Sequence, residues 1–184
     1  MAQKTWSKGS ILKTGEKVLL RDLTPRDSAK KHMEFYNKFV EEKAMVFADR
    51  KLALKEEKEW LKGKIQTMKK GGYIHIVAEK GGKIVGGASA ERGPLKQRNN
   101  VSLGIALLPE FRGKGLGSML MKHLIARVKR EMKPKNIHLD VFSENDPAIQ
   151  LYRKLGFNIH HTKKEWIDHF GEYHDQHFMT LNVK

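Results

Sequence analysis

The chain has 184 residues and no cysteine. Disulfide bonds, thiolate metal sites and cysteine nucleophiles are therefore excluded, and the composition fits a reducing compartment such as the cytoplasm. No apolar run approaches the roughly 20 residues that a membrane-spanning helix requires, so we expect no membrane partner. The segment from Met1 to Lys17 lacks the apolar core of a secretory signal.

Acidic residues are also scarce, because 21 Asp and Glu face 36 Lys and Arg and give a net charge of +15. Such a field attracts polyanions, among them nucleic acids and phosphorylated cofactors. The positive charge is spread along the chain, as on a lysine-rich solvated surface. No helix-turn-helix pattern, zinc-finger spacing or aromatic RNA-binding signature is present. The net charge supports a nucleic-acid-binding module, and the lack of these motifs leaves that module as the alternative interpretation.

The residues that are present indicate a globular protein, with 39% hydrophobic and 31% charged residues. We find no internal repeat, low-complexity tract or linker, and therefore expect one domain over residues 1–184. Hydrophobic periodicity predicts strands and helices in mixed order, which favours an α/β sheet with helices on both faces. The expected strands cover residues 17–21, 73–79, 83–90, 101–108, 137–142, a segment from 157, and 174–183, and the expected helices cover 29–40, 54–68, 116–128 and 145–155.

A glycine-rich turn joins the strand at 101–108 to the next helix, with the sequence Arg112-Gly113-Lys114-Gly115-Leu116-Gly117. Glycines let the backbone turn tightly and approach a ligand, and the free N–H groups of the helix N-terminus favour an anion such as a pyrophosphate. The side chains of Arg112 and Lys114 add charge at the rim. A P-loop would need Ser or Thr where Gly115 stands, and a dinucleotide fingerprint places its glycines at other offsets. The alternative is a turn with a helix cap.

Two blocks of residues resemble the GNAT superfamily of N-acetyltransferases. Arg112, Gly115 and Gly117 match its first signature, after a strand that ends at a proline. About 30 residues downstream, Asn145, Leu151-Tyr152 and Gly156-Phe157 match its second block. The branch that acetylates ribosomal-protein N-termini is the nearest resemblance, and it is a loose one.

This resemblance implies a mixed, mostly antiparallel sheet with helices on both faces, and central strands that splay around the cofactor. It implies an enzyme that transfers acetyl from acetyl-CoA to a primary amine of a protein N-terminus, a lysine or a small molecule. The net charge disfavours a polyamine and slightly favours a peptide or a neutral or acidic acceptor. A domain that binds CoA without catalysis is an alternative, and a homodimer is a compatible assembly.

The resemblance also assigns roles to residues. A strand bulge at Ile105, Ala106 and Leu107 would present backbone groups to the pantetheine arm and the acetyl carbonyl. The loop up to Ser118 would wrap the pyrophosphate, and Asn145 would contact the cofactor arm. The expected cofactor-binding set is Ile105, Ala106, Leu107, Arg112, Gly113, Lys114, Gly115, Leu116, Gly117, Ser118 and Asn145.

For the chemistry we expect direct attack in a ternary complex, since no cysteine exists to carry an acyl group. A backbone N–H near Leu107 would polarise the carbonyl, or would only complete the sheet. Tyr152 would protonate the departing thiolate, since a phenol is protonated at neutral pH, or would be a core aromatic residue.

Asp140 is the candidate base, at a position where the ribosomal-protein branch has Glu. A carboxylate is a weak base for an amine, so Asp140 would act through water or on an α-amino group, and a salt bridge is the alternative. Glu91 and Glu110 are weaker candidates. Strand alternation places His174 and His177 on opposite faces, so we expect no metal site there.

Overall fold

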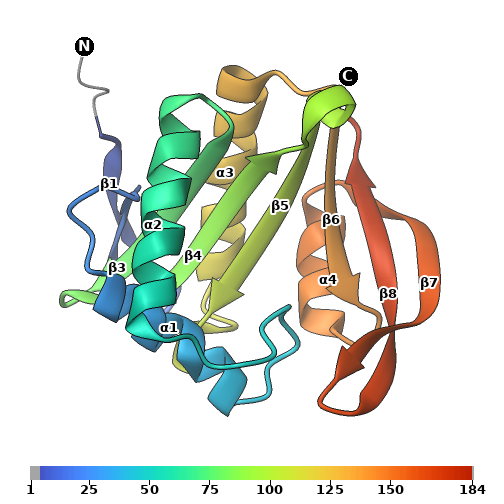
Figure 1. Ribbon diagram of the computed structural model, residues 1–184, viewed down its shortest axis with the longest axis horizontal. Helices are drawn as coiled ribbons and strands as arrows, with labels where there is room; N and C mark the ends of the chain where they lie inside the picture. The colour runs from blue at the N-terminus through green and yellow to red at the C-terminus, as the bar shows by residue number, and fades with distance from the viewer. Residues whose placement is uncertain (1–4, 184) are drawn as a thin grey trace.

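The computed structural model describes residues 5–183 and places eight strands in one sheet, in the order β1-β2-β3-β4-β5-β6-β8-β7 (Figure 1). Every neighbouring pair is antiparallel except β5 and β6. No helix among the described residues has the length and apolar character needed to cross a membrane. The strands are β1 (Ser7–Ile11), β2 (Lys17–Asp22), β3 (Tyr73–Lys80), β4 (Lys83–Arg92), β5 (Asn100–Leu107), β6 (Asn136–Phe142), β7 (Phe157–His169) and β8 (Glu172–Leu181).

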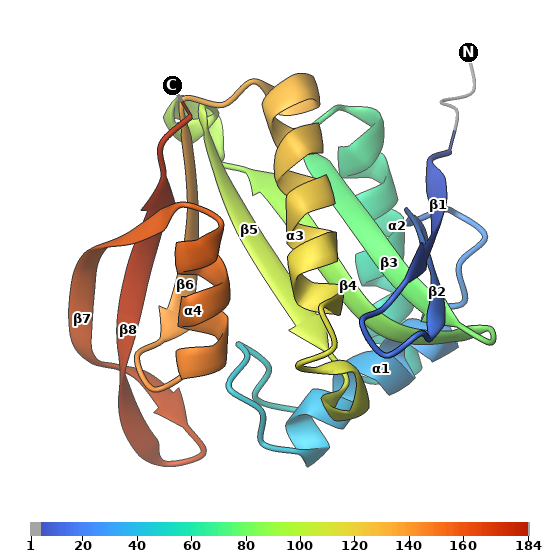
Figure 2. The ribbon, with the colours of Figure 1, turned by 180° about the vertical axis from the view of Figure 1, so that it is seen from behind.

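The helices cover both faces of this sheet. Helices α1 (Ala29–Glu41) and α2 (Leu54–Lys69) lie in front of it in Figure 1, and α3 (Leu116–Arg127) and α4 (Asp146–Lys154) lie in front of it in Figure 2, seen from behind. Helix α3 continues into one π-helical segment, Val128–Met132. The mixed, mostly antiparallel sheet with helices on both faces is therefore confirmed.

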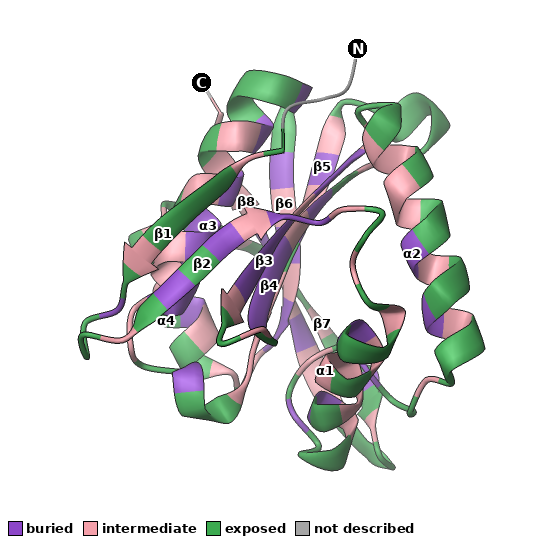
Figure 3. Ribbon diagram, turned by 90° about the vertical axis from the view of Figure 1, so that its left-hand side faces the viewer, coloured by how far each residue is buried: buried purple, intermediate pink, exposed green. Residues whose placement is uncertain are grey.

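The two faces of the sheet are packed differently. The larger hydrophobic cluster contains fully buried residues of β3, α3 and β6, such as Ile76, Leu120 and Ile137. A smaller cluster on the other face contains only four buried residues, Leu23, Leu61, Val77 and Ile84. Figure 3 shows α2 as largely exposed, with its buried residues on one side. Helices α1 and α2 thus form a thinner cover than α3 and α4.

The structure differs from the sequence-based prediction at the N-terminal end. Strand β1 was not predicted, because all but one of its residues are exposed and an exposed edge strand needs no apolar alternation. The hydrophobic periodicity of the α1 segment predicts one apolar face through Ala29, Met33, Tyr36 and Val40. The buried residues of α1 are instead His32 and Phe39.

Candidate active site

The parallel strands β5 and β6 separate soon after they meet. They pair only where residues Asn100 to Ser102 face Asn136 to His138, and the two strands diverge beyond that point (Figure 2). A cleft of about 1220 Å³ opens there and crosses the sheet, larger than the roughly 300–1,000 Å³ of common small-molecule pockets.

The backbone of β5 offers hydrogen-bonding groups to this cleft. Leu108 donates its N–H to the carbonyl of Val85 on β4, over 3.1 Å. Because antiparallel partners alternate, the N–H groups of Ile105 and Leu107 then point away from β4, toward the side where β6 has separated. Unpaired strand groups of this kind need partners, and an extended ligand with amide groups can supply them.

The irregularity that accompanies the cleft lies on β4 rather than on β5. The pairing of β5 with β4 runs unbroken from Val101 to Leu107. The register between β3 and β4 instead shifts beside Ala78, so that Val85 is the extra residue. At the next position a Cβ added to Gly86 would lie 2.6 Å from the Leu107 side chain, so glycine leaves room for that side chain as it is placed here. The bulge expected at residues 105–107 is thus on the neighbouring strand.

The glycine-rich turn presents free backbone N–H groups at the start of α3. Gly113 and Gly115 have φ values of +72° and +89°, which favour glycine. Within the described part of the chain, no backbone N–H from Gly113 to Ser118 donates a hydrogen bond. Asn145 caps α4 with its side chain, whereas no side chain caps α3. Free N–H groups at the positive end of a helix dipole form an anion site, which fits a pyrophosphate.

The remaining loop residues are placed by packing. Leu116 is fully buried in the larger cluster, so only its backbone faces a ligand. A Cβ on Gly117 would lie 3.2 Å from Leu151 and 3.3 Å from Leu107, so glycine keeps α3 close to α4 and β5. Ser118 lines the cleft, as do the three residues Ile105, Ala106 and Leu107.

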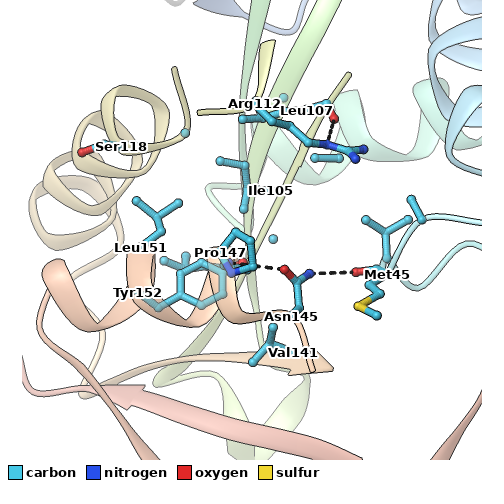
Figure 4. A pocket seen from close by; sticks show the side chains of 18 of the residues that line it. Met45, Ile105, Leu107, Arg112, Ser118, Val141, Asn145, Pro147, Leu151 and Tyr152 are labelled. Carbon is cyan, nitrogen blue, oxygen red and sulfur yellow. Dashed lines mark hydrogen bonds between the residues drawn. The ribbon is translucent and has the colours of Figure 1, made fainter. Parts of the chain in front are cut away.

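The charged side chains of the turn are held in ion pairs. Lys114 Nζ lies 2.8 Å from Glu16 Oε2, and hydrogen bonds from Lys114, Lys80 and Thr14 lower the pKa of Glu16 to about 2. Arg112 donates from Nε to the carbonyl oxygen of Leu107 over 3.1 Å (Figure 4).

The Arg112 guanidinium also pairs with Glu42, at the C-terminal end of α1. The Arg112 side chain is therefore engaged by α1. In this conformation the loop therefore offers an anion its backbone groups rather than the side chains of Arg112 and Lys114.

Three other lysines line the cleft, and the sequence analysis did not single them out. Lys13, Lys122 and Lys154 form no ion pair within the described part of the chain. Lys122 follows Ser118 by one helical turn, so helix spacing could have identified it. Lys13 reaches the loop through its backbone N–H, which bonds the carbonyl of Lys114 over 3.2 Å, a contact between distant segments.

Tyr152 is positioned by α4 and lines the cleft (Figure 4). Its side chain is buried, with 6% of its surface exposed, and packs near Phe157 at a ring separation of 6.0 Å. Burial raises the pKa of Tyr152 to about 12, so the phenol stays protonated at neutral pH. The hydroxyl has no hydrogen-bond partner within residues 5–183. A buried phenol of this kind can donate its proton to a group in the cleft.

Asn145 connects two parts of the site. Its Oδ1 accepts a hydrogen bond from the N–H of Ala148, and its Nδ2 donates to the carbonyl of Met45, each over 3.3 Å (Figure 4). Asn145 therefore caps α4 and holds the connection between α1 and α2. A direct contact with a cofactor arm stays a prediction.

Asp140 is the proposed base that lies in the cleft. It is on β6, and its Oδ1 accepts a hydrogen bond from Gln176. Continuing the register of Ser102 with His138 places Asp140 opposite Gly104, just beyond the last pair of the two strands. Glu91 is paired with Lys64 at 2.6 Å, and neither Glu91 nor Glu110 is among the residues that line the cleft.

On the α1 and α2 side, the cleft has a lining that no sequence motif indicated. Phe35 and Phe39 come from α1, Met45 and Phe47 from the following connection, and His75 from β3. These residues are apolar or histidine and are dispersed along the chain, so the sequence alone does not distinguish them from ordinary core residues. Their shared location follows only from the fold.

Comparisons with known proteins agree with this geometry. An L-amino acid N-acetyltransferase from Escherichia coli is 32% identical over 110 residues, which cover 59% of this chain and 68% of that protein. The L-methionine sulfoximine/L-methionine sulfone acetyltransferase of Pseudomonas aeruginosa is 28% identical over 157 residues, covering 82% of this chain and 87% of the relative.

Solved structures share the fold. A Salmonella typhimurium acetyltransferase with its cofactor acetyl-CoA has a TM-score of 0.79 and 26% identity, covering 91% of this chain and 94% of its own. A ribosomal-protein-alanine N-acetyltransferase from Brucella melitensis has a TM-score of 0.78 and 27% identity, covering 89% of this chain and 98% of its own.

The family model described as Acetyltransferase (GNAT) family matches residues 32–157, which include both glycine-containing blocks and Tyr152. This range covers more than half of the chain. The uncapped start of α3 and the open edge of β5 also fit the cofactor that the family uses. The chain belongs to the GNAT family of acetyl-CoA-dependent N-acetyltransferases.

Proposed function

We propose that this enzyme acetylates a primary amine by direct attack in a ternary complex, with the acceptor entering from the α1 and α2 side. The observation that carries the proposal is that one cleft crosses the sheet between β5 and β6. On one side it meets the anion site of α3, and on the other it meets the residues contributed by α1 and β3. Two substrates entering from opposite faces would meet in the gap beside Asp140 and Tyr152.

Acetyl-CoA supplies a thioester, and the chain supplies the groups that orient it and move protons. The backbone of residues 113–118 would hold the pyrophosphate, and the free edge of β5 would pair with the pantetheine amides. The N–H of Leu107 is directed toward the separated strands and would polarise the acetyl carbonyl. A preorganised donor of this kind contributes roughly 3–4 kcal/mol in acyl transfer.

Two side chains would complete the proton transfers. A carbon–nitrogen bond forms and the carbon–sulfur bond breaks, so one proton leaves the amine and one reaches the sulfur. Tyr152 would donate its phenolic proton to the departing sulfur and regain a proton from water. Asp140 would accept the amine proton, directly or through water. The buried side chain of Tyr152, whose hydroxyl has no partner among residues 5–183, and the position of Asp140 in the cleft support these roles.

The proposal is tested by calorimetric titration with acetyl-CoA, followed by incubation with an array of amines and peptides and mass spectrometry of the products. We expect saturable heat and at least one product heavier by an acetyl group. Absence of heat on titration would contradict the proposal. Binding without any acetylated product would favour a regulatory domain that holds CoA without catalysis.

A further inference from the structure

The half of the cleft that faces α1 and α2 forms what we term the acceptor chamber. Its floor contains His75 of β3, Ser89 of β4 and Gly104 of β5, which lie on one face of the sheet because they are consecutive partners in the antiparallel register. Gly104 is exposed although it lies on a central strand. The sheet is therefore uncovered at this position, which leaves space for an occupant beside the cofactor.

The wall of the acceptor chamber is apolar. Phe35 and Phe39 of α1 pack edge to face, with ring centroids 4.9 Å apart. Met45 and Phe47 lie on the connection after α1 and are 38% and 60% exposed. Large apolar side chains exposed at the lining of a cleft favour an occupant with an apolar group.

Two carboxylates line the acceptor chamber. Asp140 and Glu144 both line the cleft. Burial opposes ionisation of Glu144, but hydrogen bonds from the Ser143 side chain and the backbone outweigh it and lower its pKa. His174 lies beside Glu144, with 3.4 Å between Nδ1 and Oε2. Burial lowers the pKa of His75 to about 3, which keeps its imidazole neutral.

No unmatched Lys or Arg faces these carboxylates within the described lining. The Arg112 guanidinium is already paired with Glu42 and with the carbonyl of Leu107. The other lining cations are Lys13, Lys114, Lys122 and Lys154. Lys13 follows β1 and bonds the glycine-rich turn through its backbone, while Lys114 lies in that turn, Lys122 on α3 and Lys154 at the end of α4. The turn, α3 and α4 lie on the cofactor side of the sheet (Figure 2).

We propose that the acceptor is a primary amine attached to an apolar group and without a free carboxylate beside the amine, as in a peptide N-terminus, an amino-acid amide or an alkylamine. This inference rests on the proposed function. A carboxylate placed beside Asp140 and Glu144 is repelled and finds no free cation to pair with. The net charge of +15, taken alone, favours an acidic acceptor. That charge is a sum over the whole surface, however, and the acceptor meets only the lining of the chamber.

The test uses four amines with acetyl-CoA: L-methionine, L-methionine amide, the dipeptide methionyl-alanine and n-hexylamine. Methionine and its amide share the side chain and differ in the carboxylate. The amide also has a more acidic ammonium group, so kcat/KM is measured over pH and expressed per neutral amine. We expect the amide to exceed the free amino acid by at least about tenfold. The dipeptide and the alkylamine then show whether the enzyme prefers a peptide or a small amine.

A matched pair of variants assigns the discrimination to the acceptor chamber. Glu144→Gln removes one carboxylate from the lining, so the ratio of amide to amino acid should fall about threefold. Glu59→Gln makes the same change in net charge at an exposed position of α2 outside the cleft and should leave the ratio unchanged.

Equal kcat/KM values for methionine and its amide, per neutral amine, would overturn the inference while acetyl transfer itself stands. Equal effects of the two variants would also overturn it. If acetyl-CoA binds and none of the four amines is acetylated, the inference fails, and the array of amines and peptides decides whether the proposed function fails with it.

Discussion

The two sides of the sheet offer different groups to a ligand. On the α3 and α4 side, the site uses backbone groups of one continuous segment, from the end of β5 through the start of α3. On the α1 and α2 side, it uses side chains from α1, β3, β5 and β6, held together only by the fold. A site for a shared cofactor can be encoded by glycine spacing, whereas a site for a particular acceptor depends on which side chains meet.

The packing of the two sides differs in the same way. The larger cluster fixes α3 and α4 on the sheet, while the smaller cluster leaves Gly104 uncovered on the α1 and α2 side. Regions with few buried contacts are the ones that adjust most readily to a ligand. We therefore expect substitutions on the α3 and α4 side to change cofactor binding or chemistry, and substitutions on the α1 and α2 side to change the use of the acceptor.

The largest effect is expected for Tyr152→Phe. Loss of a general acid typically lowers the rate by 10²–10⁴-fold, so kcat should fall about 100-fold. The dissociation constant for acetyl-CoA should not change, because only the hydroxyl is removed. With the pKa near 12, Tyr152 remains an acid below about pH 10, so the wild-type rate should show no loss from its ionisation in that range. A folded variant with unchanged turnover would leave Tyr152 as a packing residue.

A second prediction compares two glycines of similar backbone conformation. Gly113 and Gly71 have φ values of +72° and +70°, and a Cβ at either would meet no protein atom within 4 Å. Alanine should cost both positions about 1 kcal/mol of folding free energy, with similar losses in melting temperature. Only Gly113→Ala should weaken acetyl-CoA binding, by about 20-fold in calorimetry, because its Cβ would meet the ligand. Equal affinities for both variants would remove the loop from the cofactor site.

Asp140→Asn tests the proposed base, which lies where the two sides of the cleft meet. Without a carboxylate to accept the amine proton, kcat/KM for the acceptor should fall about tenfold at neutral pH, while the affinity for acetyl-CoA is retained. Asp140→Glu keeps the carboxylate and should restore most of the activity in the same steady-state assay. An Asn variant as active as the wild type would limit Asp140 to accepting the hydrogen bond of Gln176.

Only a small effect on cofactor affinity is expected for Arg112→Ala, although Arg112 belongs to the glycine-rich block. Because the guanidinium contacts Glu42 and the Leu107 carbonyl, calorimetry should show a loss of less than about threefold in acetyl-CoA affinity. The acceptor KM should rise instead, and Glu42→Gln should reproduce that rise. A tenfold loss of acetyl-CoA affinity would mean that the guanidinium turns onto the phosphates when the cofactor binds.

Features encoded within short segments could be predicted from the sequence, and features that join distant residues could not. Apolar periodicity located all strands but β1, and the Gly113 to Gly117 spacing located the free N–H groups, since both signals lie within short segments. The pairing of Arg112 with Glu42 joins residues 70 positions apart, and the alignment of His75, Ser89 and Gly104 across three strands follows from strand register. The acceptor chamber was missed because its phenylalanines and glycine carry no local signal that distinguishes a site from a core.

The claim on which the account depends is that the backbone between Gly113 and Ser118 binds the diphosphate of CoA. Calorimetric titration with pantetheine, 4′-phosphopantetheine and CoA tests it directly, because these ligands share the arm and differ in phosphates and nucleotide. We predict that affinity rises at each step and that CoA binds at least about 100-fold more tightly than pantetheine, roughly 2.7 kcal/mol. Equal affinities for the three ligands, or no binding of CoA, would contradict the account.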